Sequence, residues 1–158
     1  MNKKEFLKLI KKDKFQVFLF ITPIPFNFIT HPWFVIVQKG TYTRWEVWGK
    51  QNMFQKSWGH VHQCSHKPWQ GMKRILFRKT NRFESKLIGV IEGKEGSIAE
   101  KMGKYIIRNS KTYKHTYTYR FVPGPNSNTF VQHFINKFPE SGFVLPKTCI
   151  GKGYKVKN

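Results

Sequence analysis

Acidic residues and cysteines are scarce in this chain of 158 residues. Eight Asp and Glu residues stand against 29 Lys and Arg, so the formal net charge is +21 and the isoelectric point is near 10.2. A field of this sign attracts polyanions such as nucleic acid, anionic lipid or acidic wall polymers. The lysines are scattered from Lys3 to Lys157 rather than gathered in one block, so a solvated surface without a polyanion partner is the alternative.

A disulfide framework is excluded, because Cys64 and Cys149 could form one bridge at most. A long hydrophobic run is missing too, since Pro23, Pro25 and Asn27 interrupt the apolar stretch at 15–29. A membrane-spanning helix needs about 20 mostly apolar residues, and no small-x-small cleavage site follows the stretch. We therefore expect a buried strand here and no membrane association. These absences leave the compartment open and favour the cytoplasm.

Aromatic residues are abundant, with 15 Phe, 6 Tyr and 5 Trp making up 16% of the chain, so a disordered chain is not expected. A chain of this length fits one domain that buries roughly 70% of the surface of its unfolded form. No internal repeat or low-complexity linker divides it. We expect a basic N-terminal arm at 1–14 and a single domain at 15–158.

The hydrophobic pattern predicts both strands and helices. Alternating and β-branched stretches favour strands at 16–22, 31–37, 42–48, 72–79, 85–92 and 116–122. Apolar residues at helical spacing predict helices at 98–109, after a capping box at Ser97, and at 128–138, before Pro139. This pattern is typical of an α+β domain with an antiparallel sheet and two main helices.

A four-residue turn at 38–41 should join two of these strands into an antiparallel hairpin. If Gln38 pairs with Thr41, then His31 and Glu46 share a face as diagonal neighbours within reach of long side chains. A slip of one residue in the pairing would move Glu46 to the other face of the sheet.

Ser127 lies where the second predicted helix begins, and it is a candidate nucleophile. A serine nucleophile needs a base to accept its proton, and the base needs a partner that orients it. His31 and Glu46 could fill these two roles if the hairpin pairs as described.

The helix start also offers groups that could stabilise negative charge. The N–H groups of Asn128 and Thr129 could form an oxyanion hole, with Asn126 in the same pocket. Asn and Ser are also the preferred residues for capping a helix N-terminus. An ordinary cap at Asn126 or Ser127 is therefore the alternative to a catalytic site.

A run of alternating histidines and one cysteine could bind metal. If this segment is extended, all four side chains point to one face, and zinc accepts both ligand types. Four neighbouring ligands would crowd one ion, so two or three would bind it with help from elsewhere. The alternative is a polar loop without metal, and no other cofactor is predicted. The four residues are His60, His62, Cys64 and His66.

Several sequence stretches together resemble a bacterial domain-of-unknown-function family, number 3750, over about residues 28–154. They are Pro123-Gly-Pro-Asn-Ser-Asn-Thr-Phe130, Phe138-Pro-Glu140, Leu145-Pro146, Ile150-Gly-Lys152, His31-Pro-Trp33 and Tyr42-Thr-Arg-Trp-Glu46. More remotely, the order of these parts is similar to the circularly permuted papain-like fold, which includes NlpC-type cell-wall amidases and lecithin:retinol acyltransferase relatives. That resemblance implies base, orienting and nucleophile roles for His31, Glu46 and Ser127. It also implies a permuted papain-like topology, although those enzymes carry cysteine where this chain has Ser127.

The leading functional expectation is a hydrolase or acyltransferase-like domain that acts on an amide or ester of unknown identity. The alternative is a catalytically inactive basic module that binds an acidic polymer, a lipid or nucleic acid. Interleaved aromatic and basic residues at 69–74 and 113–120 suit single-stranded nucleic acid, but no RRM, KH or zinc-finger signature is present. The sequence does not predict the oligomeric state.

Overall fold

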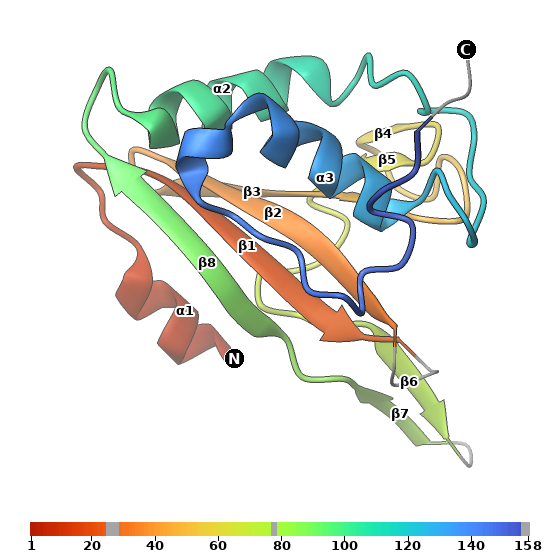
Figure 1. Ribbon diagram of the computed structural model, residues 1–158. Helices are drawn as coiled ribbons and strands as arrows, with labels where there is room; N and C mark the ends of the chain where they lie inside the picture. The colour runs from red at the N-terminus through yellow and green to blue at the C-terminus, as the bar shows by residue number, and fades with distance from the viewer. Residues whose placement is uncertain (25–28, 77–78, 156–158) are drawn as a thin grey trace.

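The computed structural model describes residues 1–24, 29–76 and 79–155, and it shows a single α+β domain (Figure 1). Within these ranges the strands are β1 (Phe15–Pro23), β2 (Thr30–Gln38), β3 (Thr41–Val47), β4 (Ser57–Trp58), β5 (Val61–Gln63), β6 (Lys73–Leu76), β7 (Lys79–Arg82) and β8 (Lys86–Gly93). Six of them form an antiparallel sheet in the order β4-β5-β3-β2-β1-β8. The remaining two, β6 and β7, pair only with each other.

Helices cover both faces of the large sheet (Figure 1). The two main helices, α2 (Ile98–Asn109) and α3 (Ser127–Lys137), lie on one face, and the short 3₁₀ helix η1 (Pro139–Ser141) follows α3. The basic arm forms α1 (Lys3–Leu9), which lies on the opposite face. The expected α+β domain with an antiparallel sheet and two main helices is therefore confirmed. No helix in the described ranges is long and apolar enough to cross a membrane.

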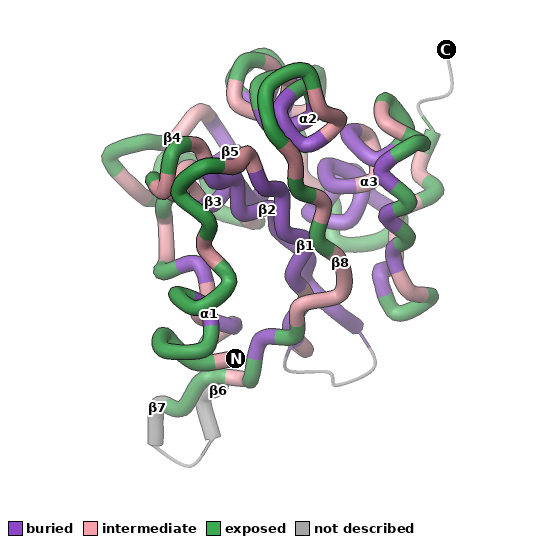
Figure 2. The backbone as a smooth tube through the Cα atoms, turned by 90° about the vertical axis from the view of Figure 1, so that its left-hand side faces the viewer, coloured by how far each residue is buried: buried purple, intermediate pink, exposed green. Residues whose placement is uncertain are grey.

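The central strands are buried on both faces, as Figure 2 shows. In β2, eight of nine residues are buried, which explains why this strand reads as a nearly continuous apolar run. Its even-numbered residues Phe34 and Ile36 pack with the residues of α2 and α3. Its odd-numbered residues Trp33 and Val35 pack with Phe6 of α1, which is 0% exposed. The sheet thus separates two hydrophobic clusters.

The turn between β2 and β3 sets the register on which the candidate site depends. Lys39 and Gly40 have φ values of 50° and 77°, and two such residues form the turn that suits the twist of a hairpin. Gln38 pairs with Thr41, as predicted, and the pairing continues to Phe34 opposite Trp45.

The predicted helices at 98–109 and 128–138 are confirmed, with α3 beginning one residue earlier. The predicted strand at 116–122 is wrong. Turn hydrogen bonds from Thr116 N to Tyr113 O and from Thr118 N to His115 O use backbone groups that a strand would offer to a neighbour. The alternation of Tyr and Thr in this segment therefore does not reflect a sheet.

The predicted strand at 72–79 is also corrected. It covers β6 and the beginning of β7, which pair antiparallel, so this stretch is a hairpin rather than one strand. Residues 77 and 78 of this prediction lie outside the described ranges. The strand predicted at 85–92 is confirmed as β8.

Candidate active site

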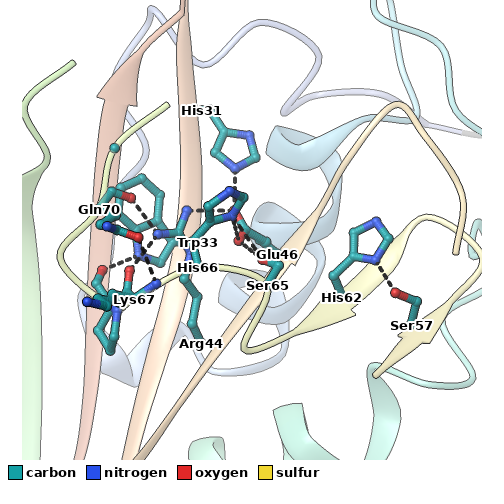
Figure 3. A network of polar contacts seen from close by, with 12 residues as sticks. His31, Trp33, Arg44, Glu46, Ser57, His62, Ser65, His66, Lys67 and Gln70 are labelled. Carbon is teal, nitrogen blue, oxygen red and sulfur yellow. Dashed lines mark hydrogen bonds and ion pairs between the residues drawn. The ribbon is translucent and has the colours of Figure 1, made fainter. Parts of the chain in front are cut away.

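Glu46 of β3 is 0% exposed and is the centre of a buried polar network (Figure 3). One carboxylate oxygen, Oε2, lies 2.9 Å from His31 Nε2 and accepts a hydrogen bond from Arg44 Nη2 at 2.7 Å. The other, Oε1, accepts a hydrogen bond from Ser65 Oγ and lies 3.4 Å from His66 Nδ1. The hairpin register therefore produces the predicted contact between His31 and Glu46, and it adds three partners.

Arg44 fixes the network to the loop that follows β5. Its guanidinium lies 3.9 Å from the centre of the Trp33 ring, a stacking arrangement that favours Arg. Its Nη1 donates to the carbonyls of Lys67 and Gln70 at 3.0 and 2.5 Å. Trp33 Nε1 donates to Pro68 O at 3.0 Å, so the same loop is held at a further point.

The surroundings of Glu46 keep it ionised. Burial alone would raise the pKa of this carboxyl, but the charge of Arg44 and the hydrogen bonds from His31 and His66 outweigh burial and hold it well below its usual range. An ionised carboxylate can only accept hydrogen bonds. His31 Nε2 must therefore carry the hydrogen that it shares with Glu46.

His31 is uncharged and can therefore accept a proton. Burial lowers its pKa more than Glu46 raises it. The ring is then neutral at pH 7, with its hydrogen on Nε2 and a lone pair on Nδ1. Nδ1 forms no hydrogen bond within the described ranges, and in Figure 3 it points away from Glu46.

The lowered pKa of His31 predicts a pH dependence of stability. Its folded pKa is below the unfolded value near 6.5, so unfolding takes up a proton when the pH falls below about 6.5. We expect the free energy of unfolding to decrease there, by up to about 1.4 kcal/mol per pH unit for each such histidine. His62 and His133 also have pKa values lowered by burial and should contribute.

Urea denaturation of the wild type and of His31→Gln at several pH values between 5 and 8 measures this slope. We expect the variant to have a shallower slope below pH 6.5, with the remainder due to the other histidines. An unchanged slope would show that His31 is not buried in its neutral form.

Asn126, and not Ser127, is the N-cap of α3. Its Oδ1 accepts hydrogen bonds from the N–H groups of Asn128 and Thr129 at 2.9 and 3.1 Å. Its own N–H donates to Thr129 Oγ1, which completes a capping box. Ser127 is therefore the first residue of the helix, and its hydroxyl forms no hydrogen bond within the described ranges.

The same contacts correct the expected oxyanion hole. In this structure the N–H groups of Asn128 and Thr129 are occupied, because both donate hydrogen bonds to Oδ1 of the Asn126 cap. The N–H of Phe130 donates to Asn126 O. In the described ranges, the N–H of Ser127 is the donor of this first turn that has no partner. A developing negative charge at the helix start would meet that N–H group.

The helix start is bound to the Ile150-Gly151 segment near the C-terminus. Ile150 O accepts hydrogen bonds from the side-chain amides of Asn126 and Asn128, and Gly151 O accepts one from Thr129 Oγ1. Gly151 has a φ of 85°, and a Cβ there would lie 2.5 Å from Asn126 Nδ2. The stretches at 123–130 and 150–152, which both belong to the family resemblance, are therefore joined by hydrogen bonds.

His31 and Ser127 line the same cavity of about 260 Å³, where β2 and α3 begin. No hydrogen bond joins the Ser127 hydroxyl to the His31 ring in the described ranges. Asn126 and Asn128 also line this cavity, whereas Thr129 lines a different one. The remaining lining residues are largely apolar: Ile24, Ile29, Thr30, Met72, Tyr119, Phe121, Val122 and Ile150.

A comparison with protein-family models identifies the sequence family. The model described as "Protein of unknown function (DUF3750)" matches residues 13–154. The chain belongs to this family. No curated protein and no solved structure matches the chain. The DUF3750 region contains His31, Glu46, Ser127 and the Ile150-Gly151 segment, whereas α1 precedes it.

The three histidines among the predicted zinc ligands have separate partners, and Cys64 lies apart from them as an exposed free cysteine. His60 Nδ1 lies 2.7 Å from Trp48 O, and His62 Nδ1 lies 2.7 Å from Ser57 Oγ, away from the Glu46 network (Figure 3). His66 faces Glu46, and Cys64 is exposed with a φ of 54° just after β5 ends. The run is therefore not one extended strand. In the described ranges, no group of three or more His, Cys, Asp or Glu side chains could hold a metal ion.

Sequence reasoning missed three partners of Glu46. Arg44 stands two residues before Glu46 in the same strand, so the period of two already places both side chains on one face. His66 was considered only as a metal ligand. No local pattern points to Ser65, because it reaches Glu46 through the fold of a loop.

Proposed function

We propose that this DUF3750 protein is a hydrolase or acyltransferase that attacks an amide or ester through Ser127. His31 acts as the general base, and Glu46 holds its ring and tautomer. One observation carries the proposal: His31, whose Nε2 contacts the Glu46 carboxylate, lines the same cavity as the Ser127 hydroxyl, which has no hydrogen-bond partner among the described residues.

In the proposed reaction, Ser127 Oγ attacks the carbonyl carbon while its proton moves to His31 Nδ1. The Ser127 N–H and the N-terminus of α3 stabilise the negative charge on the carbonyl oxygen. His31 then returns the proton to the leaving amine or alcohol, and water or a second alcohol or amine releases the acyl group. The hydrogen bond from Ser127 to His31 would form as the substrate binds, because such contacts are often loose in free enzymes.

The cavity lining indicates an apolar acyl group. Ile24, Ile29, Met72, Phe121 and Val122 surround the two reactive side chains, and no Asp, Glu, Lys or Arg is among the described lining residues. A charged acyl group would lose its hydration there without gaining a partner. We therefore expect esters or amides of apolar acids to react faster than those of charged acids.

The chain order of these residues fits the permuted papain-like topology that the sequence resemblance implies, and this topology is part of the proposal. In such a topology the base lies on an early strand and the nucleophile lies at the start of a later helix, as His31 on β2 and Ser127 on α3 do. Serine in place of cysteine requires a base to remove its proton, because a hydroxyl is far less acidic than a thiol. Because the contact with Glu46 keeps the hydrogen of His31 on Nε2, Nδ1 has a lone pair that can accept the proton of Ser127.

A fluorophosphonate probe, which reacts with activated serines, tests the proposal. We expect the wild type to be labelled at Ser127 and Ser127→Ala to be unlabelled, with His31→Gln strongly slowed, by about 10²-fold or more. Ser97→Ala is the matched control, because Ser97 also stands at a helix start but caps α2 through Glu100 N, and this variant should be labelled normally.

Circular dichroism should show that Ser127→Ala folds as the wild type does. If the probe does not label the wild type, the catalytic proposal is rejected, and the inactive binding module becomes the better explanation. Labelling that survives in Ser127→Ala would place the nucleophile elsewhere.

A further inference from the structure

A second cavity, of about 610 Å³, lies beside the Glu46 network but contains neither His31 nor Ser127. Four parts of the chain that are separated in sequence build it: α1, β3, the loop after β5, and β7. Figure 1 shows α1 and the β6–β7 hairpin on the side of the sheet opposite α2 and α3. The lining residues are Lys3, Tyr42, Arg44, Cys64, Ser65, His66, Lys67, Pro68, Trp69, Gln70 and Arg82.

The charges of this cavity are of one sign. Lys3, Arg44, Lys67 and Arg82 line it, and no Asp or Glu is among its lining residues in the described part of the chain. Glu46 pairs with Arg44, but Lys3, Lys67 and Arg82 form no ion pair within the described ranges. Burial lowers the pKa of Arg44, and the charge of Arg82 adds to this lowering. The cavity is thus a concave site with three uncompensated cations.

The walls of the cavity include rigid aromatic groups. Trp69 and Tyr42 are each half-buried, and their rings pack on the buried ring of Phe6 at 5.5 and 5.3 Å. Ser85 Oγ donates to Trp69 O at 2.7 Å, which holds the backbone behind the wall. Arg44 is held in place by hydrogen bonds to Glu46 and to two loop carbonyls. These supports hold the site in place before a ligand binds.

We propose that this cavity binds a phosphate monoester of a small molecule that has a flat aromatic ring. A phosphate monoester carries a charge of about −1.5 to −2 at pH 7, which suits several cations better than a single carboxylate does. The cavity is far larger than a phosphate group alone, and Trp69 and Tyr42 offer surfaces for a ring. This is a binding site beyond the proposed catalytic function, because its residues do not include the nucleophile or the base.

Isothermal titration calorimetry of the full chain with AMP tests the site, with inorganic phosphate and adenosine as the two partial ligands. We expect AMP to bind one site and to bind more weakly as salt is raised. Each partial ligand should bind more weakly than AMP. The double variant Lys67→Gln/Arg82→Gln should weaken AMP binding by about tenfold or more.

A matched control comes from a different basic cavity, of about 250 Å³, that includes Lys114 and Lys155. The double variant Lys114→Gln/Lys155→Gln removes the same charge and should bind AMP as the wild type does. The site assignment is overturned if AMP does not bind at millimolar concentration or if both double variants weaken binding equally. If adenosine binds as tightly as AMP, the site does not recognise the phosphate group. If inorganic phosphate binds as tightly as AMP, the site does not recognise the ring. Either result contradicts the proposal.

Discussion

Replacing Glu46 with Ala should lower the free energy of unfolding by about 3–5 kcal/mol. Arg44 is 1% exposed and would keep its charge in the core without a counter-ion. Ser65 and His31 would lose their hydrogen-bond acceptor as well. The cost comes mainly from the groups left without a partner, and less from the attraction that is lost.

Urea denaturation monitored by circular dichroism measures this loss. Glu140→Ala is the control, because Glu140 is exposed and forms no ion pair within the described ranges; we expect its effect to be below about 0.5 kcal/mol. The double variant Glu46→Leu/Arg44→Met should be more stable than Glu46→Ala, since no charge is then left buried. A loss below about 1 kcal/mol for Glu46→Ala, as for a surface ion pair, would contradict the buried network.

Replacing Asn126 with Ala should cost about 2–4 kcal/mol, more than the loss of an ordinary helix cap, which costs about 0.5–2 kcal/mol. The Asn126 side chain accepts hydrogen bonds from two N–H groups of α3. It also donates to Phe121 O and Ile150 O at 2.8 and 3.1 Å. Alanine would remove the cap and separate the helix start from the segment at 150–151.

The same unfolding measurement on two further variants separates these contributions. Ser97→Ala removes the single capping bond of α2 and should cost about 1 kcal/mol. Asn126→Asp keeps the acceptor for the helix but loses both donated bonds, so its cost should fall between those of Ser97→Ala and Asn126→Ala. Equal losses for Ser97→Ala and Asn126→Ala would mean that Asn126 is only a cap.

The pairing of His31 with Glu46 could be predicted because it depends on local rules. A two-residue turn determines which residues of β2 and β3 face each other, and the strand period determines which side chains share a face. The same period would have placed Arg44 beside Glu46. The helix at 98–109 could be predicted equally well, because its N-terminal cap and the spacing of its apolar residues both indicate a helix that begins after Ser97.

Other parts of the site depend on contacts between distant segments and could not be predicted. The loop that carries Ser65 and His66 is held near Glu46 by hydrogen bonds from Arg44 and Trp33. The run from His60 to His66 alternates as a strand does, but its three histidines contact separate partners in the folded chain. Alternation along a segment predicts which side chains share a face. It does not predict whether those side chains will be free to bind a metal ion, because other parts of the folded chain can contact them.

The position of the register-setting turn between β2 and β3 has a consequence for the order of folding. His31 and Glu46 are 15 residues apart on one hairpin, and short loops close at a lower entropic cost than long ones. Ser127 lies much farther from His31 in the sequence, and its helix start is held by the segment at 150–151, so placing it in the cavity closes a longer loop. We therefore expect the base and its carboxylate to be in place before the serine, so the chain would acquire its reactive hydroxyl as one of the last steps of folding.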